Sequence, residues 1–265
     1  MKLAFRKAER KDLIQIGKLI RSGFSPRYIE MMIWGCRGAE KYLADLIDIE
    51  NTICDISNYV GIIDDKIVAV TQLKRNISDR TLHLNYICTD QAYRKKNVGS
   101  KLLLHSITEE SNIFEHMALD VFLDNAIASR WYSDLGFNAL ATREWLVIST
   151  KILDSRVGYV SGLPQSNCCF EEYGFSQFML STDKGNYSIG ILGENYYRLA
   201  DVKIIEDLVG ISTLFKLAPN REILLIAENP TIKNTQVKIN KVAATVHMTT
   251  DVNNLIGKIN KNAIN

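Results

Sequence analysis

A short basic loop that leads into an apolar helix is the part of this sequence best suited to chemistry. Residues 92–107 read AYRKKNVGSKLLLHSI, with basic residues at positions 94–96. The unpaired N–H groups and the positive dipole end of a helix N-terminus attract phosphate, and flanking Lys or Arg strengthens the attraction. Gly99 leaves room for phosphate oxygens, and Asn97 enters the left-handed region at little cost. The loop therefore either binds phosphate or is a solvated cluster of charges at a helix start.

The hydrophobic pattern of residues 1–150 predicts the elements that must hold this loop. Strands are expected at LAFRKA near the N-terminus, in two runs within 59–73 joined by a hairpin at Asp64-Asp65-Lys66, at 82–89, at 117–123 and at 143–150. Helices are expected after Asp12 as N-cap, over 26–49 with a break near Gly35 and Gly38, after the basic loop, and after Asp124 or Asn125 as a cap, with Gly136 as the stop. This order predicts a mixed sheet flanked by helices.

The second half of the chain reads as a strand-rich α/β region. A linker is predicted at 151–168, followed by the strand-like runs CCFEEYGFSQFMLS and YSIGILGENYYRL, in which Cys168 and Cys169 alternate as strand residues. A helix over 202–217, strands at 222–227 and 241–250 and a polar helix around 251–261 follow. This succession imitates the later part of residues 1–150, so a decayed internal duplication is one interpretation.

Composition describes an ordinary folded protein and limits its partners. Of 265 residues, 46% are hydrophobic and 23% charged, with 32 Lys and Arg against 30 Asp and Glu. This near-balance argues against nucleic acid or a membrane as the main partner. The sequence has no run long and apolar enough to span a membrane, so a cytoplasmic protein is expected. Five cysteines without paired CxxC spacing predict reduced thiols and no metal site.

Two motifs carry a resemblance to a known family. The stretch 94–99, RKKNVG, resembles the R/Q-x-x-G-x-G/A loop of the GCN5-related N-acetyltransferases (GNAT), with the family's usual tyrosine before it as Tyr93. Residues 119–137, LDVFLDNAIASRWYSDLGF, resemble the family's later segment L-x-V-x-x-x-N-x-x-A-x-x-x-Y-x-x-x-G-F. Asn97 departs from the first glycine of the loop, and Thr89 stands where the family often has Val.

The resemblance implies a fold and a co-substrate. Residues 1–150 are expected to form a GNAT acyl-CoA N-acyltransferase domain, followed at 151–265 by a smaller strand-rich α/β domain. Acetyl-CoA or another acyl-CoA would place its pyrophosphate on the loop amides and its pantetheine between the strands at 82–89 and 117–123. Asn125 would bond the pantetheine arm or only cap its helix. The cofactor-binding residues implied are Cys88, Thr89, Arg94, Lys95, Lys96, Asn97, Val98, Gly99, Ser100 and Asn125.

The resemblance also implies catalytic roles. Tyr132 is expected to be the general acid that protonates the leaving CoA thiolate, although its place beside Trp131 also suits an ordinary core aromatic. His83 stands where histone-type members carry a glutamate base, and a half-buried structural histidine is the other interpretation. Asp120 and Asn85 are weaker candidates for the base. The family's direct attack by the amine makes a covalent intermediate on a cysteine improbable.

The sequence therefore predicts an N-acetyltransferase that acts on a primary amine of a small molecule or peptide. The rival interpretation is a catalytically inactive GNAT fold that senses CoA or binds a protein. Met31, Met32, Ile33 and Trp34 would line the acceptor pocket or belong to the core. The helix at 202–217 is entered through RLADVK without glycine, so the second half is expected to bind no CoA. It would complete the acceptor groove or provide the face of a homodimer.

Overall fold

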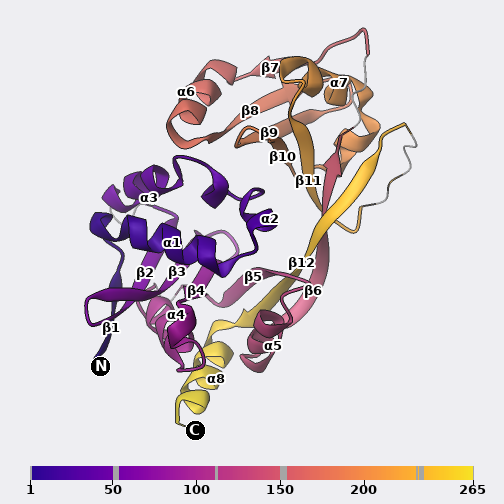
Figure 1. Ribbon diagram of the computed structural model, residues 1–265. Coiled ribbons are helices and arrows are strands. Elements are labelled where there is room, and N and C mark those ends of the chain that lie inside the picture. Colours follow the sequence, from indigo (N-terminus) through magenta and orange to yellow (C-terminus); the bar gives the residue numbers. More distant parts are fainter. Residues whose placement is uncertain are drawn as a thin grey trace. The chain divides into compact units, whose positions relative to one another are not determined.

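The computed structural model describes residues 2–49, 54–110, 113–149, 154–230, 232 and 236–264 (Figure 1). The chain divides into two compact units. Unit 1 contains residues 1–26, 40–141 and 246–265, and unit 2 contains residues 27–39 and 142–245. Residues 246–265 thus pack with the N-terminal half, although the sequence analysis assigned them to the domain at 151–265. The sequence analysis predicted a GNAT domain at 1–150 and a second domain at 151–265. This division of function between the two stretches stays a prediction.

Unit 1 is built on a mixed sheet. Its first four strands pair antiparallel in chain order: β1 (Leu3–Lys7), β2 (Ile56–Ile63), β3 (Lys66–Asn76) and β4 (Thr81–Thr89). Strand β5 (His116–Phe122) runs parallel to β4, and the last part of β12 (Ile239–Asp251) follows beside β5. Asp64 and Asp65 both have positive φ, 48° and 62°, which is the backbone of a tight hairpin turn. The hairpin predicted at these residues is confirmed.

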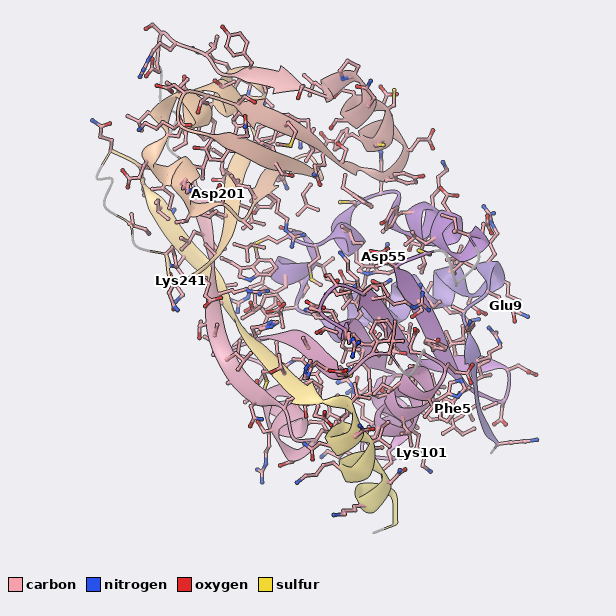
Figure 2. The ribbon with its side chains drawn as sticks, turned by 180° about the vertical axis from the view of Figure 1, so that it is seen from behind. Phe5, Glu9, Asp55, Lys101, Asp201 and Lys241 are labelled. Atoms are coloured by element: carbon pink, nitrogen blue, oxygen red, sulfur yellow. The ribbon has the colours of Figure 1, made fainter. Side chains whose placement is uncertain are left out.

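Helices cover both faces of this sheet. They are η1 (Arg10–Asp12), α1 (Leu13–Gly23), α3 (Ala39–Asp48), η3 (Gln91–Tyr93), α4 (Val98–Thr108), α5 (Ala126–Asp134) and α8 (Val252–Ile264). Helices α4 and α8 share one apolar cluster with β2–β5, which includes Leu102, Leu255 and Leu82. Phe5 of β1 stacks on His105 of α4, one turn after Lys101 (Figure 2). Helix α1 packs on β3 and β4 but adds no side chain to that cluster among the described residues, so it covers the other face.

Unit 2 repeats the strand directions of unit 1. Strands β7 (Tyr159–Ser161), β8 (Phe175–Ser181), β9 (Asn186–Leu192) and β10 (Tyr196–Leu199) pair antiparallel in order. Strand β11 (Glu222–Glu228) is parallel to β10 and antiparallel to β6 (Asn138–Ile148). Four antiparallel strands followed by a parallel fifth are thus found in both units. The internal duplication that the sequence analysis gave as one interpretation stays a prediction, and this repeat of strand directions is an observation in its favour.

One predicted strand is a helix. Residues 163–173, part of which the sequence analysis assigned to a linker and the rest to a strand, form α6 (Leu163–Tyr173), and both Cys168 and Cys169 are exposed on it. Pro164 lies in the first turn and Gly174 ends the helix with φ 74°. Proline at a helix start and glycine just after its end are boundary signals, and here they outweigh the apolar composition of the segment. The expected linker at 151–168 begins at 151–153, outside the described residues.

One helical region breaks where the sequence predicts, and one predicted helix is interrupted. The region 26–49 forms α2 (Pro26–Ile29), η2 (Ile33–Gly35) and α3, because two glycines punctuate it. Met31 and Trp34 are buried in unit 2. The region 202–217 forms η4 (Val202–Glu206) and α7 (Leu208–Leu217), divided by Asp207. Asp12 occupies the N-cap position of α1 without capping it, because its carboxylate instead accepts hydrogen bonds from Arg6 and the Glu9 N–H.

Candidate functional site

Strands β4 and β5 of unit 1 separate along their length. Their recorded pairing joins Thr81–Leu84 with His116–Leu119, whereas β4 continues to Thr89 and β5 to Phe122. The pairing register between β3 and β4 shifts at Gln72, which leaves Asn85 as an extra residue on β4. Such a bulge bends the strand that carries it and ends regular pairing. The far end of β4 therefore offers main-chain groups that an extended ligand can bond like an added strand.

The basic loop follows β4 directly and has the backbone that the sequence predicts. Asn97 lies in the left-handed region with φ 57° and ψ 14°, and α4 begins at the next residue, Val98. The Asn97 side chain makes no capping bond. Within the described residues, the N–H groups of Val98, Gly99 and Ser100 have no recorded acceptor, as expected for the first turn of a helix. A methyl group added at Gly99 would lie 3.1 Å from Thr89 Oγ1, so this position needs a small residue.

The side chains of the loop are anchored at its base and exposed at its tip. The Arg94 guanidinium donates to the Thr89 carbonyl oxygen at 3.1 Å, which ties the loop to the end of β4. Lys96 Nζ lies 5.3 Å from the ring centroid of Tyr93. Arg94, Lys95 and Lys96 are all exposed. Three cations beside a helix N-terminus make this loop a suitable site for an anion.

Tyr132 lies on the buried side of α5, and its hydroxyl is chemically unusual. Burial raises the pKa of Tyr132, and the nearby Cys88 raises it further. The phenol therefore keeps its proton throughout the neutral pH range and is available as a donor. Asn125 caps α5 by accepting a hydrogen bond from the Ala128 N–H at 3.1 Å. Capping uses the carboxamide oxygen and leaves the amide NH₂ of Asn125 available to a ligand.

The Cys88 thiol is poorly suited to act as a nucleophile. Burial raises the pKa of Cys88 to about 12, with only a small opposing effect of Arg94. The reactive thiolate is thus scarce near neutral pH. We expect iodoacetamide at pH 8 to label the exposed Cys168 and Cys169 rapidly and Cys88 only after unfolding, as mapped by peptide mass spectrometry. Labelling of native Cys88 at the rate of Cys168 would contradict this, and the urea-unfolded chain is the control for intrinsic reactivity.

His83 is part of a polar cluster on the face of the sheet opposite α4. Its neighbours Leu82 and Leu84 belong to the apolar cluster under α4, so His83 points the other way. His83 Nε2 lies 3.2 Å from Asp120 Oδ2, and Asp120 Oδ1 lies 3.2 Å from His247 Nδ1. The structure thus brings together two of the predicted candidates for the base, His83 and Asp120. It adds His247, on β12, which the sequence analysis did not single out.

A row of amides continues this cluster across the sheet. Asn85 Oδ1 lies 3.1 Å from His83 Nδ1, and Asn85 Nδ2 donates to Gln72 Oε1 at 3.2 Å. Gln72 Nε2 in turn donates to Asn58 Oδ1 at 2.8 Å, and both of these residues are buried. Each amide in the row thus fixes the orientation of the next. Asn85 therefore positions the His83 ring rather than acting as a base itself, because a carboxamide has no basic nitrogen.

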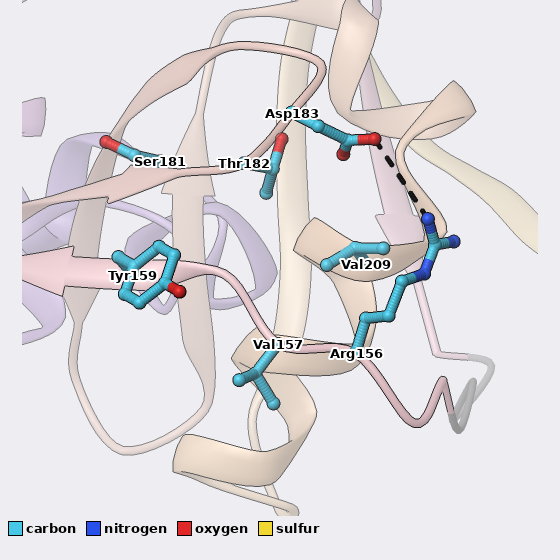
Figure 3. Close-up of a pocket in the computed structure, with 7 residues that line it drawn as sticks. All are labelled: Arg156, Val157, Tyr159, Ser181, Thr182, Asp183 and Val209. Atoms are coloured by element: carbon cyan, nitrogen blue, oxygen red, sulfur yellow. Dashed lines mark ion pairs between the residues drawn. The ribbon is translucent and has the colours of Figure 1, made fainter.

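The described part of unit 2 has no comparable basic loop between β10 and α7. Helix α7 is capped by the buried Asp207, whose carboxylate accepts from the Gly210 N–H at 2.8 Å and from the Thr182 hydroxyl. A carboxylate thus already occupies the site where a phosphate would bind, and it would repel one. Unit 2 also contains a pocket of about 500 Å³ lined by residues 156, 157, 159, 181–183 and 209, where Arg156 pairs with Asp183 (Figure 3). None of the predicted site residues lines it.

Comparisons with known proteins were made for the sequence and the fold. Residues 28–137 match the model of the acetyltransferase (GNAT) family. A tandem GNAT protein from the clavulanic acid biosynthesis pathway superposes with a TM-score of 0.67 and 10% identity, over 94% of this chain and 98% of that one. A proposed acetyltransferase from Pyrococcus horikoshii gives a TM-score of 0.59 and 11% identity over 94% and 89% of the two chains.

A third structure, PaiA N-acetyltransferase from Thermoplasma acidophilum in complex with coenzyme A, is 20% identical over 53% of this chain and 92% of that one, with a TM-score of 0.47. No curated protein sequence matches the chain. No helix in the described part of the chain is both long and apolar enough to cross a membrane. These first two likenesses, which cover nearly the whole chain, show that it shares the fold of both structures.

Proposed function

We propose, from the premise that residues 28–137 form an acetyltransferase domain of the GNAT family, that this protein transfers an acetyl group from acetyl-CoA to an amine of a small molecule or peptide. One observation carries the proposal. The open end of β4 leads directly into a loop whose left-handed Asn97 leaves the amides of Val98, Gly99 and Ser100 without acceptors among the described residues. This arrangement suits a ligand with an extended arm joined to a diphosphate.

In this proposal acetyl-CoA follows the open end of β4. The pyrophosphate accepts hydrogen bonds from the first-turn amides of α4, and the exposed Lys95 and Lys96 add electrostatic attraction. Main-chain groups of Cys88 and Thr89 pair with the pantetheine amides. The NH₂ group of Asn125 is the third contact, because its oxygen is already engaged in capping α5. Unit 2 takes no CoA, since Asp207 occupies the equivalent helix N-terminus.

The chemistry needs one base and one acid. The amine nitrogen attacks the thioester carbonyl carbon, and His83 takes the amine proton, directly or through water. Collapse of the tetrahedral intermediate breaks the C–S bond, and the Tyr132 hydroxyl gives its proton to the departing sulfur. The amide product and free CoA leave. Asp120 lies 3.2 Å from His83 Nε2, so it stabilises the imidazolium as the ring accepts a proton. No covalent enzyme intermediate is required, in agreement with the unreactive Cys88.

The proposal is tested by binding first and turnover second. Thermal unfolding should shift upward with acetyl-CoA, because a ligand that binds only the folded state stabilises it. Release of CoA thiol is then followed over a panel of polyamines, amino acids, aminoglycosides and peptides with free N-termini. Release with at least one amine supports the enzyme. Binding of acetyl-CoA without release on any amine would instead favour a CoA-sensing module, and no binding would overturn both.

The conformation of Asn97 gives a prediction about affinity. Asn97→Gly should keep the affinity for acetyl-CoA, because glycine adopts φ 57° freely. Asn97→Val should weaken it by about 5-fold to 30-fold, the equivalent of about 1–2 kcal/mol for a residue forced into the left-handed region. Isothermal titration calorimetry measures both variants, with thermal unfolding as the control for stability. Equal affinities for the two variants would show that the left-handed turn is not needed.

A further inference from the structure

We propose that His83, Asp120 and His247 form a binding site for a divalent transition-metal ion such as Zn²⁺. The three side chains come from β4, β5 and β12 of unit 1, and one ligand atom from each lies within 4.8 Å of the others. Two imidazoles and one carboxylate are a ligand set that zinc accepts in sites with an open fourth position. Metal binding is inferred from this geometry alone. Its effect on catalysis rests on the function proposed above.

Two of the three distances between the ligand atoms match those around one tetrahedral ion. Bonds of about 2.0–2.1 Å at a tetrahedral angle place neighbouring ligand atoms about 3.3 Å apart. The two nitrogen–oxygen distances to Asp120 are both 3.2 Å. The two histidine rings also lie nearly parallel, 15° apart. The side chains of His83, Asp120 and His247 are 24%, 25% and 19% exposed, so an ion can enter and keep a water ligand.

The row of amides indicates which nitrogen of His83 would bind the ion. Asn85 Nδ2 donates to Gln72, so the oxygen of Asn85 faces His83 Nδ1 and can accept its N–H. In this arrangement Nε2 of His83 faces the Asp120 carboxylate, 3.2 Å away. Nε2 is therefore the nitrogen that would bind the ion beside Asp120.

The same row provides the support that metal ligands usually have. A histidine that binds metal through one nitrogen commonly donates the other N–H to an oxygen, which fixes the ring. Asn85 does this for His83, and buried Gln72 and Asn58 hold Asn85 in turn. All three ligands lie on strands rather than loops. The site is therefore largely formed before an ion arrives.

An ion at this site would stop acetyl transfer. It would hold the Nε2 lone pair of His83 that the proposed reaction uses to accept the amine proton. We therefore expect Zn²⁺ to inhibit thiol release and a chelator to restore it. This outcome tests both proposals together, whereas direct binding tests only the metal site.

Zn²⁺ binding is measured on the full chain by competition with a chromogenic chelator. The experiment uses the background variant Cys168→Ser/Cys169→Ser. This variant removes two exposed thiols, adjacent in the sequence, that could bind Zn²⁺ elsewhere on the chain. We expect about one ion per chain. His247→Gln should weaken Zn²⁺ binding by at least about tenfold. Substitution of residues that only support the ligands already costs about 10- to 100-fold in metal affinity. His116→Gln, which replaces an exposed histidine on β5, should leave binding unchanged and is the matched control.

A second measurement does not depend on variants that could unfold. The chain has four histidines, and ¹⁵N NMR of the unaltered protein should show Zn²⁺ perturbing the rings of His83 and His247 but not those of His105 and His116. Loss of binding in the Cys168→Ser/Cys169→Ser background, or no perturbation of His83 and His247, would overturn the site. Binding at this cluster without inhibition of an active enzyme would keep the metal site and remove His83 as the base.

Discussion

Tyr132→Phe should lower kcat about 100-fold or more while the affinity for acetyl-CoA stays unchanged. A positioned general acid contributes about 10²- to 10⁴-fold, and the lower end applies here because a thiolate is already a fair leaving group. Burial and Cys88 raise the pKa of Tyr132, so the wild-type hydroxyl stays protonated where an ordinary phenol, with a pKa of about 10, begins to ionise. The acid form is lost only above the raised pKa. The rate should therefore show no decline from Tyr132 ionisation below about pH 10.

Affinity should survive because the substitution removes only the hydroxyl group. The Tyr132 ring packs against Trp131, with centroids 4.9 Å apart, and against Phe137 at 5.6 Å. Phenylalanine keeps both contacts. Steady-state thiol release gives kcat, and calorimetry with acetyl-CoA gives Kd. The expected split between the two identifies a group that acts in the transition state rather than in binding.

Tyr197→Phe is the matched control for this experiment. Tyr197 is another buried tyrosine, in unit 2, and its ring packs against Phe178. Loss of its hydroxyl should leave kcat unchanged. If Tyr132→Phe keeps the wild-type rate, or if it loses activity only in proportion to a weaker Kd, Tyr132 is a core residue and not the acid.

The loop was predictable because its signals are local. A left-handed residue before a helix and a small residue near its first turn are requirements of a few consecutive residues, and Asn97 and Gly99 meet them in the sequence as in the structure. The same holds for the turn at Asp64 and Asp65 and for the capping of α5 by Asn125. The left-handed turn at Asn97, the hairpin turn and the cap of α5 each depend on residues no more than three positions apart, and only the contact of Gly99 with Thr89 spans ten positions.

The polar cluster was only partly predictable, because strand pairing is not local. Alternation shows that His83 and Asp120 each lie opposite apolar neighbours, but it does not say which strands are adjacent. His247 is 127 positions from Asp120, and only the placement of β12 beside β5 brings the two together. The buried row of Gln72 and Asn58 was missed for the same reason. The sequence signal that could have revealed Gln72 and Asn58 is a polar side chain at a strand position that faces a covering helix.

Unit 2 shows the converse case, in which local signals were present but read wrongly. Pro164 and Gly174 mark the two ends of α6, yet the sequence analysis assigned the run CCFEEYGFSQFMLS, which begins inside this helix, to a strand. Unit 2 keeps the strand directions of unit 1, whereas the Asp207 carboxylate caps the helix N-terminus that would otherwise suit a phosphate. The two units therefore share strand directions but differ in the residue that caps the helix after their fourth strand.

Removing the carboxylate of Glu110 should strongly destabilise unit 1. Glu110 is buried, with its side chain 2% exposed, and it forms a two-oxygen pair with Arg75, at 2.6 Å to Nε and 3.1 Å to a terminal nitrogen. The hydroxyls of Ser57 and Tyr59 donate to the same carboxylate at 2.5 and 3.0 Å. Glu110→Met leaves the Arg75 charge without this partner, which typically costs about 3–5 kcal/mol in the free energy of unfolding.

Urea unfolding followed by circular dichroism measures this loss as a lower midpoint at unchanged slope. Glu109→Met alters the exposed neighbouring glutamate and should shift stability by no more than about 0.5 kcal/mol. The double variant Arg75→Met/Glu110→Met should be more stable than Glu110→Met alone, because it removes the uncompensated charge. It should not reach wild type, because the hydroxyls of Ser57 and Tyr59 lose their acceptor at about 1–3 kcal/mol for each buried donor left unbonded. A double variant no more stable than Glu110→Met would mean that shape, and not charge, governs this site.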